Sequence, residues 1–404
     1  MTQNRLRAIY AANLAAILTV LASALLLAVF WRVPGTNSSE GTALLTTTAP
    51  PAPPPSVVRL MAVGDNLIHD TIYEQAAARA AGRGYDFGYA YEGVRGLLSR
   101  ADLSVINQES PITGAVARPS SYPLFSSPTQ VGDAVYDLGF RAVNLSNNHM
   151  LDKGTAGVTA SLDYWAAKAG VATSGAYRDE ADFATPHVLE VNGVTFGFVG
   201  ATYSFNGLQL PRGSELVLPL LEEEDRLFRA ISLARANADV VVASLHWGTE
   251  NSQETTEGQR LLARKAVGWG ADVILGTHPH VLQGMEWLEK PGGGKAFVAY
   301  SLGNFISAQS KAPQLIGGVL ELVVTKDNTD GAVTLSQPKF TPVITYYGAG
   351  YSNLRLVPWA GFGRALAESH GVRRGDARFS YDYCKRLLKE TIPEGILDLT
   401  STKG

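Results

Sequence analysis

Five of the seven histidines lie in short polar clusters, most of which directly follow hydrophobic runs typical of buried β-strands. The clusters are 64–69 (GDNLIH), 147–149 (NNH), 244–248 (SLHWG) and 276–280 (GTHPH), with the acidic cluster 107–109 (NQE) between the first two. In an open α/β sheet the carboxyl ends of neighbouring strands meet at one crevice, so we expect these side chains to gather there. Oxygen and imidazole donors bind divalent metal ions, and the pattern therefore predicts a metal site.

The His278-Pro279-His280 segment gives the strongest local signal. Residues two apart in an extended segment project to the same side, and proline fixes its own φ and favours an extended residue before it. We therefore expect both imidazoles to face one metal pair. An exposed polar turn is the alternative, but it does not explain why the apolar run 272–277 leads straight into the histidines.

The remaining clusters carry weaker signals. Asp65 and Glu109 end strand-like runs and offer carboxylates for a cation, although Gly-Asp after a strand is also ordinary turn chemistry. His246 ends a third run, where a histidine is often a hydrogen-bonded core residue. Asn107, beside Glu109, is a further polar candidate.

A loop between two predicted elements combines an amide, an imidazole and a carboxylate. Asn148 offers a neutral oxygen to a metal, and His149 is a candidate general acid oriented by Asp152. The alternative is that this polar loop only caps the helix expected to begin near Gly157.

The body of the chain alternates strands and helices, which predicts βαβ units and a largely parallel sheet. After about Gly317 the pattern changes to antiparallel strands, for which a second sheet packed on the first would account. The predicted strands are 57–63, 103–106, 142–145, 194–199, 240–245, 273–275 and 297–300, and the predicted helices are 71–81, 157–169, 220–236 and 258–269.

The amino-terminal region predicts a membrane anchor. Residues 9–31 carry no charge, and about 20 apolar residues cross a bilayer. Arg5 and Arg7 precede this run, so we expect a cytoplasmic amino terminus and an extracytoplasmic body. A cleaved signal peptide is the alternative. The predicted division is a stub and anchor (1–33), a Pro/Ser/Thr-rich stalk (34–56), the main domain (57–310), and carboxyl-terminal strands completing the second sheet with a helical tail (311–404).

Composition excludes several classes of protein. With 46% hydrophobic and 18% charged residues among 404, the chain can bury a large core. A net charge of -3 supplies no cationic field for nucleic acid. The single cysteine, Cys384, excludes both an internal disulfide framework and a thiolate zinc cluster.

The ordered motifs GDNLIH, NQES, NLSNNHMLDKG, SLHWGTE, GTHPHVLQGME and YSLGNFI, spread over residues 57–307, resemble the CapA/PgsA family of poly-γ-glutamate capsule biosynthesis proteins. That resemblance implies an α/β fold of the calcineurin-like metallophosphoesterase type, a four-layer α-β-β-α sandwich, following the amino-terminal transmembrane helix. It also implies one or two divalent ions, among which the residues do not distinguish Zn, Mn and Fe.

The resemblance implies specific ligands. One metal would be held by Asp65, Glu109 and His280, and another by Glu109, Asn148, His246 and His278, while His149 would protonate the leaving group. The sequence departs from the superfamily in two places. Leu67 stands where a histidine is usual, so His69 or a water would have to replace that ligand, and Glu109 stands where a bridging aspartate is usual.

The expected function follows from this resemblance. We expect a membrane-anchored, extracytoplasmic component of poly-γ-glutamate synthesis or export with a hydrolytic metal site and membrane partner subunits. Arg118 would bind the anionic polymer, with Trp247 as a wall of the cleft. The alternatives are a general extracytoplasmic metal-dependent phosphoesterase and a non-catalytic metal-binding scaffold. A nucleotidase is less expected, because the chain after Ser307 is short for a nucleotide-binding domain.

Overall fold

The computed structural model describes residues 52–400. The predicted anchor, residues 9–31, and most of the predicted stalk lie outside these residues. Within residues 52–400, no helix combines the length and the apolar character that a membrane crossing requires.

The first sheet has eight strands and carries the amino-terminal half of the predicted metal ligands. Its order is β14-β13-β12-β1-β2-β3-β4, and the short β11 pairs with the end of β1. The strands β1 to β4 run parallel, whereas β12, β13 and β14 are antiparallel. Their bounds are β1 Ser56–Asn66, β2 Leu103–Asn107, β3 Phe140–Asn144, β4 Ala172–Ser174, β11 Asn304–Ile306, β12 Ile316–Lys326, β13 Val333–Tyr346 and β14 Arg355–Pro358.

The second sheet has six strands in the order β5-β6-β7-β8-β10-β9. The four central strands are parallel, and the two edge strands are antiparallel. The bounds are β5 Val188–Val191, β6 Val194–Thr202, β7 Val240–His246, β8 Val273–Thr277, β9 Met285–Glu289 and β10 Lys295–Ala299.

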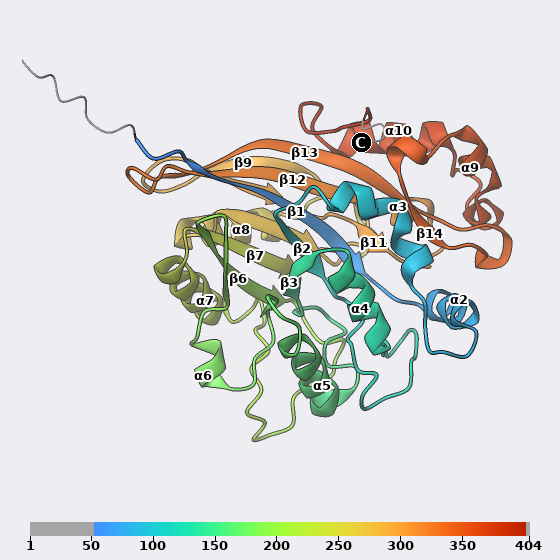
Figure 1. Cartoon of the computed structure of the whole chain (residues 1–404), viewed down its shortest axis with the longest axis horizontal. Helices are drawn as coiled ribbons and strands as arrows, with labels where there is room; N and C mark the ends of the chain where they lie inside the picture. Colours follow the sequence, from blue (N-terminus) through green and yellow to red (C-terminus); the bar gives the residue numbers. More distant parts are fainter. Residues whose placement is uncertain (1–51, 401–404) are drawn as a thin grey trace, which may run out of the picture. The chain divides into compact units, whose positions relative to one another are not determined.

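The sheets pack face to face, and helices cover their outer faces (Figure 1). Alternation along β7 shows the layers, since Val240 and Val242 point into the core shared with the first sheet while Val241 and Ala243 pack with helices α7 and α8. The helices are α2 Asp70–Ala80, α3 Gly88–Leu98, α4 Thr129–Asp137, α5 Gly154–Ala166, α6 Glu180–Phe183, α7 Glu224–Asn237, α8 Glu257–Trp269, α9 Arg364–Ser369 and α10 Tyr381–Thr391, with short 3-10 turns η1 Ala312–Leu315, η2 Ala349–Tyr351, η3 Trp359–Gly361 and η4 Gly371–Arg374.

The predicted mixture of α/β units and antiparallel strands is present, but the strands are distributed differently. The carboxyl-terminal strands do not complete a separate second sheet, because β12 pairs with β1 along its length, from Ser56–Lys326 to Val63–Val319. The second sheet is formed instead by β5 to β10, in the middle of the chain. Hydrophobic runs alone do not distinguish these arrangements, because strands buried on both faces look alike in sequence.

Local sequence explains where α8 begins and ends. The Thr256 hydroxyl accepts from the Gln259 N–H and the Gln259 side chain accepts from the Thr256 N–H, which is a capping box. The helix stops at Gly270, whose φ of 120° is open to glycine. The chain then enters β8, which leads to His278.

Candidate metal centre

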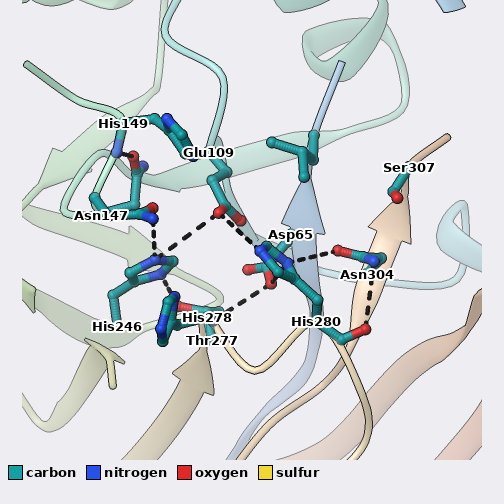
Figure 2. A network of polar contacts seen from close by, with 12 residues as sticks. Asp65, Glu109, Asn147, His149, His246, Thr277, His278, His280, Asn304 and Ser307 are labelled. Atoms are coloured by element: carbon teal, nitrogen blue, oxygen red, sulfur yellow. Dashed lines mark hydrogen bonds and ion pairs between the residues drawn. The ribbon is translucent and has the colours of Figure 1, made fainter. Parts of the chain in front are cut away.

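The predicted ligands meet at the carboxyl ends of strands from both sheets. β1 delivers Asp65, β2 leads to Glu109, and β7 ends in His246. The loop after β3 carries Asn148, and the turn after β8 carries the histidine pair. Figure 2 shows the carboxylates and the three histidines converging, with Glu109 pointing toward the rings of His246 and His280.

The tightest part of the cluster consists of Asp65, Glu109 and His246. All three are fully buried, and one potential ligand atom from each lies within 4.8 Å of the others. Glu109 Oε1 lies 3.5 Å from His280 Nε2 and 3.9 Å from His246 Nε2. This group of carboxylates and imidazole could bind a divalent metal ion.

Glu109 provides the test of whether a metal fits. Neither of its two carboxylate oxygens, although buried, has a hydrogen-bond partner. Burial, followed by the negative charge of Asp65, raises the pKa of Glu109 well above its ordinary value. A buried carboxylate without donors is costly unless it is protonated or bound to a cation, so its environment fits a metal ligand.

His246 and His278 lie on one side of Glu109. His246 Nε2 is 3.0 Å from Asn148 Oδ1, and its Nδ1 is 2.9 Å from the Thr277 hydroxyl. The His278 ring lies 4.9 Å from that of His246, and its buried Nδ1 has no partner. Burial lowers the pKa of both histidines, that of His278 to about 4. Both rings are therefore neutral near pH 7, as metal coordination requires.

Asp65 and His280 lie on the other side. His280 Nδ1 is 3.1 Å from Asp65 Oδ2, while the Asn107 amide donates to Asp65 Oδ1 over 2.7 Å. Burial lowers the pKa of His280, but hydrogen bonding and the charge of Asp65 outweigh it and raise the pKa overall. Asn107 therefore contacts the centre through Asp65.

The His-Pro-His segment is not extended, which corrects the sequence prediction. β8 ends at Thr277, and the next three residues form a bend in which His278 and His280 have φ values of 95° and 59°. Non-glycine residues seldom adopt such angles, and they concentrate at functional sites. Both rings still reach the cluster, with centroids 6.0 Å apart, but the bend rather than strand alternation directs them.

The predicted acid is next to this cluster. His149 Nδ1 lies 2.8 Å from Asp152 Oδ2, which also accepts the Phe125 N–H over 2.6 Å. The Phe125 ring packs edge-on against His149 at 4.7 Å. The carboxylate and the aromatic ring thus fix the imidazole orientation, as expected for a proton donor.

The other predicted residues occupy different environments. The His69 ring packs edge-on against Phe125 at 5.4 Å, and its Nδ1 is 3.2 Å from the Ala308 N–H, while burial lowers its pKa to about 4. Arg118 is exposed in the loop after Glu109. Trp247 is 2% exposed, and its indole N–H donates to the Tyr300 carbonyl over 2.9 Å. The last observation corrects the prediction, because a ring in the core does not form a cleft wall.

Two residues at the centre were not predicted. Asn304 Oδ1 lies 3.0 Å from His280 Nδ1, and the exposed Tyr203 ring covers His278 at 4.3 Å. Asn304 lies within the YSLGNFI motif, so a signal for it existed. Nothing in the sequence around Tyr203 marks it, since it simply follows β6.

The fold and the cluster together define a layered α/β protein with a buried carboxylate–imidazole centre at the strand ends. The family model described as "Bacterial capsule synthesis protein PGA_cap" matches residues 59–309. The chain therefore belongs to this family, as the motifs predicted.

Two curated relatives share part of the sequence. The chain is 35% identical over 188 residues to the capsule biosynthesis protein CapA of Bacillus anthracis, and 36% identical over 180 residues to the PGA biosynthesis protein CapA of Bacillus subtilis (strain 168). The alignments cover 46% and 43% of this chain and 44% of each relative. The chain thus matches less than half the length of either protein.

Solved structures show a more distant likeness. A phosphatase from Mycoplasma pneumoniae is 12% identical with a TM-score of 0.42, covering 72% of this chain and 94% of that one. A putative 5'-nucleotidase from Staphylococcus aureus, in complex with alpha-ketoglutarate, is 14% identical with a TM-score of 0.43, covering 82% and 58%.

Proposed function

We propose that this protein is a component of poly-γ-glutamate capsule synthesis or export whose metallophosphatase-like centre binds or processes the anionic polymer. Membership of the capsule synthesis family supports the process. The single observation that carries the metal centre is Glu109, a buried carboxylate without hydrogen-bond donors that lies between two imidazoles. The layered sheets and this centre support a four-layer fold of the calcineurin-like metallophosphoesterase type.

The ligand assignment is the one that the family resemblance implies, and the unpartnered atoms of Glu109 and His278 support it. Glu109, His246, His278 and Asn148 would hold one ion, and Asp65, Glu109 and His280 are the donors available to a second. Zn, Mn and Fe all suit these donors. A divalent metal in this position supplies Lewis-acid chemistry that polarises a phosphoryl or carbonyl oxygen and lowers the pKa of water.

The side chains around the centre have separate tasks in this proposal. Asp152 keeps the His149 ring oriented so that its other nitrogen can donate a proton to a leaving group. Phe125 packs against His149 and His69 and restricts water on that side. Ester or amide hydrolysis is the reaction that these groups fit best.

Cationic side chains on the surface are candidates to contact an anionic polymer. Arg178 and Arg212 line a hollow of about 560 Å³ along α5, a helix that begins two residues after Asp152. Arg178 also pairs with Asp163 at 2.7 Å. Arg118 lies exposed on the loop that follows β2 and Glu109. These three guanidinium groups are our candidates for carboxylate contacts.

We further propose that residues 9–31 anchor the protein as a single-pass membrane protein, with a cytoplasmic amino terminus and the described domain outside the cell. Membrane subunits of a polymer synthase or export complex would be its partners. The uncharged run and the two arginines before it support this placement.

Complementation tests the function. In a strain that lacks the gene, the full-length chain is expected to restore capsule polymer, and the His278→Ala/His280→Ala double variant is expected to fail. Full polymer output from the double variant would leave only a non-catalytic role. Unchanged polymer in the deletion strain would favour the second candidate, a general extracytoplasmic phosphoesterase, for which the His149–Asp152 pair is the supporting observation.

The surface cations have their own experiment. The Arg178→Glu/Arg212→Glu variant should bind the polymer more weakly, with a smaller dependence on salt, because each lost cation removes a screened attraction. Its metal content should equal that of the unmodified chain. Polymer affinity at low salt, measured for both proteins, decides the point, and equal affinities would remove these arginines from the proposal.

A further inference from the structure

We infer that Asn304 is a positioning residue that fixes which ring nitrogen of His280 faces the metal. This inference rests on the metal centre of the proposed function and concerns a residue outside its ligand set. The observation that carries it is the environment of the buried Asn304 amide. Acceptors surround its Nδ2, whereas its Oδ1 faces the His280 ring.

The amide end of Asn304 has only acceptors around it. Its Nδ2 donates to Gln309 Oε1 over 2.7 Å and to the Gln314 carbonyl over 2.9 Å, and it lies 3.3 Å from the His280 carbonyl. Backbone carbonyls cannot donate, so reversing the amide would place its oxygen against two of them. The Asn304 oxygen must therefore face the imidazole.

The orientation of this amide determines the proton on His280. His280 Nδ1 lies 3.0 Å from Asn304 Oδ1 and 3.1 Å from Asp65 Oδ2. The amide oxygen only accepts, as does the ionised carboxylate, so Nδ1 must carry a hydrogen. Nε2 is then the nitrogen with a free lone pair in the neutral ring, and it is the one that faces Glu109, at 3.5 Å. A metal ion shared with Glu109 would bind that atom.

The backbone brings Asn304 to this place through an unusually close approach of two strands. β11 runs parallel to β1 with Asp65 opposite Asn304, and the Asp65 N–H donates to the Gly303 carbonyl over 3.0 Å. A Cβ on Gly64 would lie 1.8 Å from that same carbonyl oxygen, so only glycine fits there. Asn304 itself is 1% exposed, so its side chain is shielded from bulk solvent.

The test uses the full-length chain and Co²⁺ titration. Asn304→Leu keeps the branched side-chain shape but removes the acceptor, and we expect it to weaken Co²⁺ binding by about 10- to 100-fold, the usual cost of losing a partner of a ligating histidine.

The matched control is Asn66→Leu. Asn66 is fully buried next to Asp65, but its side chain bonds Gln108 and Tyr91 rather than a histidine. Its Co²⁺ affinity should stay close to that of the unmodified chain. Gln309→Ala, at a half-buried position, is a milder variant that removes one anchor of the amide, and we expect a small loss of affinity. Equal affinity of Asn304→Leu and the unmodified chain, or equal losses in Asn304→Leu and Asn66→Leu, would overturn the inference.

A spectroscopic measurement separates proton position from general damage to the fold. In metal-loaded protein with ¹⁵N-labelled histidine, His280 should give a slowly exchanging Nδ1–H signal, absent in His280→Gln and lost or broadened in Asn304→Leu. A signal on Nε2 instead would contradict the inference. If the unmodified chain binds no Co²⁺, the metal centre of the proposed function fails. If it binds and Asn304→Leu does not differ from it, only the present inference fails.

Discussion

His278 at the candidate metal centre and His370 in the carboxyl-terminal part of the chain are similar in burial and in pKa. Both are buried, and burial lowers the pKa of each to about 4. They differ in their partners. His370 Nδ1 accepts the Val372 N–H over 3.1 Å and its Nε2 donates to the Thr345 carbonyl over 2.9 Å, whereas the buried His278 Nδ1 has none. Burial and pKa therefore do not distinguish the two rings, whereas the unsatisfied Nδ1 of His278 marks it as the better candidate for a metal ligand.

The largest expected effect concerns Glu109, whose buried oxygens lack a hydrogen-bond partner just as His278 Nδ1 does. Glu109→Gln should reduce metal affinity by more than about 100-fold, since it removes a charged ligand rather than an outer residue. Without metal the same variant should be more stable than the unmodified chain by about 1 to 3 kcal/mol, because a buried unpaired charge is gone. Denaturant unfolding with and without metal measures both effects.

Because the pKa of Glu109 is raised, the direction in which pH changes the stability of the metal-free protein can be predicted and used as a control. The unfolded chain loses this proton near pH 4.5 and the metal-free folded chain only at a higher pH, so the penalty is absent below 4.5 and grows above it. Glu109→Gln should remove this pH dependence. A less stable metal-free variant at pH 7 would contradict the account.

The second prediction compares the alanine variants of these two histidines. His278→Ala should abolish most metal binding with little loss of stability, because its ring lies under the exposed Tyr203 and one of its nitrogens is unpartnered. His370→Ala should bind metal normally but lose about 2 to 4 kcal/mol, because a buried ring and two hydrogen bonds are removed. Elemental analysis and thermal unfolding of both variants are the measurements. Equal metal contents would show that the unpartnered nitrogen has no special meaning.

The smallest expected effect is the loss of folding stability that protonation of His370 causes at low pH. Its folded-state pKa of about 4 lies below the ordinary 6.5, so the stability it contributes is complete above pH 6.5 and is lost as the pH falls toward 4. The denaturation midpoint of the metal-free protein should show this decline, and His370→Gln should flatten it. His278 titrates in the same window, so in metal-loaded protein its share should appear as metal release instead. If His370→Gln has the same slope as the unmodified chain, the assignment to His370 is wrong.

Several helices were predictable because amphipathic spacing is local. The predicted helices 71–81 and 258–269 correspond to α2 and α8 within one residue at each end, and 157–169 is offset by three residues from α5. α3 and α4 were missed. Gly88, Gly93 and Gly96 lower the helical propensity of α3, which forms because Tyr91 and Val94 are buried against the core.

The polar clusters leave out the two histidines that lie away from the centre, but they do not select the ligands, since His69 lies in a cluster and accepts the Ala308 N–H instead. Five histidines lie in polar clusters, whereas His187 and His370 do not, and the structure places those two outside the centre. Trp247 shows the limit of this reasoning. It stands beside a predicted ligand, but alternation along the strand directs it into the opposite layer, under α8.

The sequence by itself determined the donor types, their place at strand ends and the family to which they belong, because these depend on runs of neighbouring residues. Only the tertiary structure decided that β12 to β14 join the sheet of β1, that His278 and His280 turn into the site through left-handed backbone angles, and that Asn304 lies against His280. These features depend on pairings between segments far apart in the chain, such as Asp65 with Asn304, whose partners no local pattern specifies.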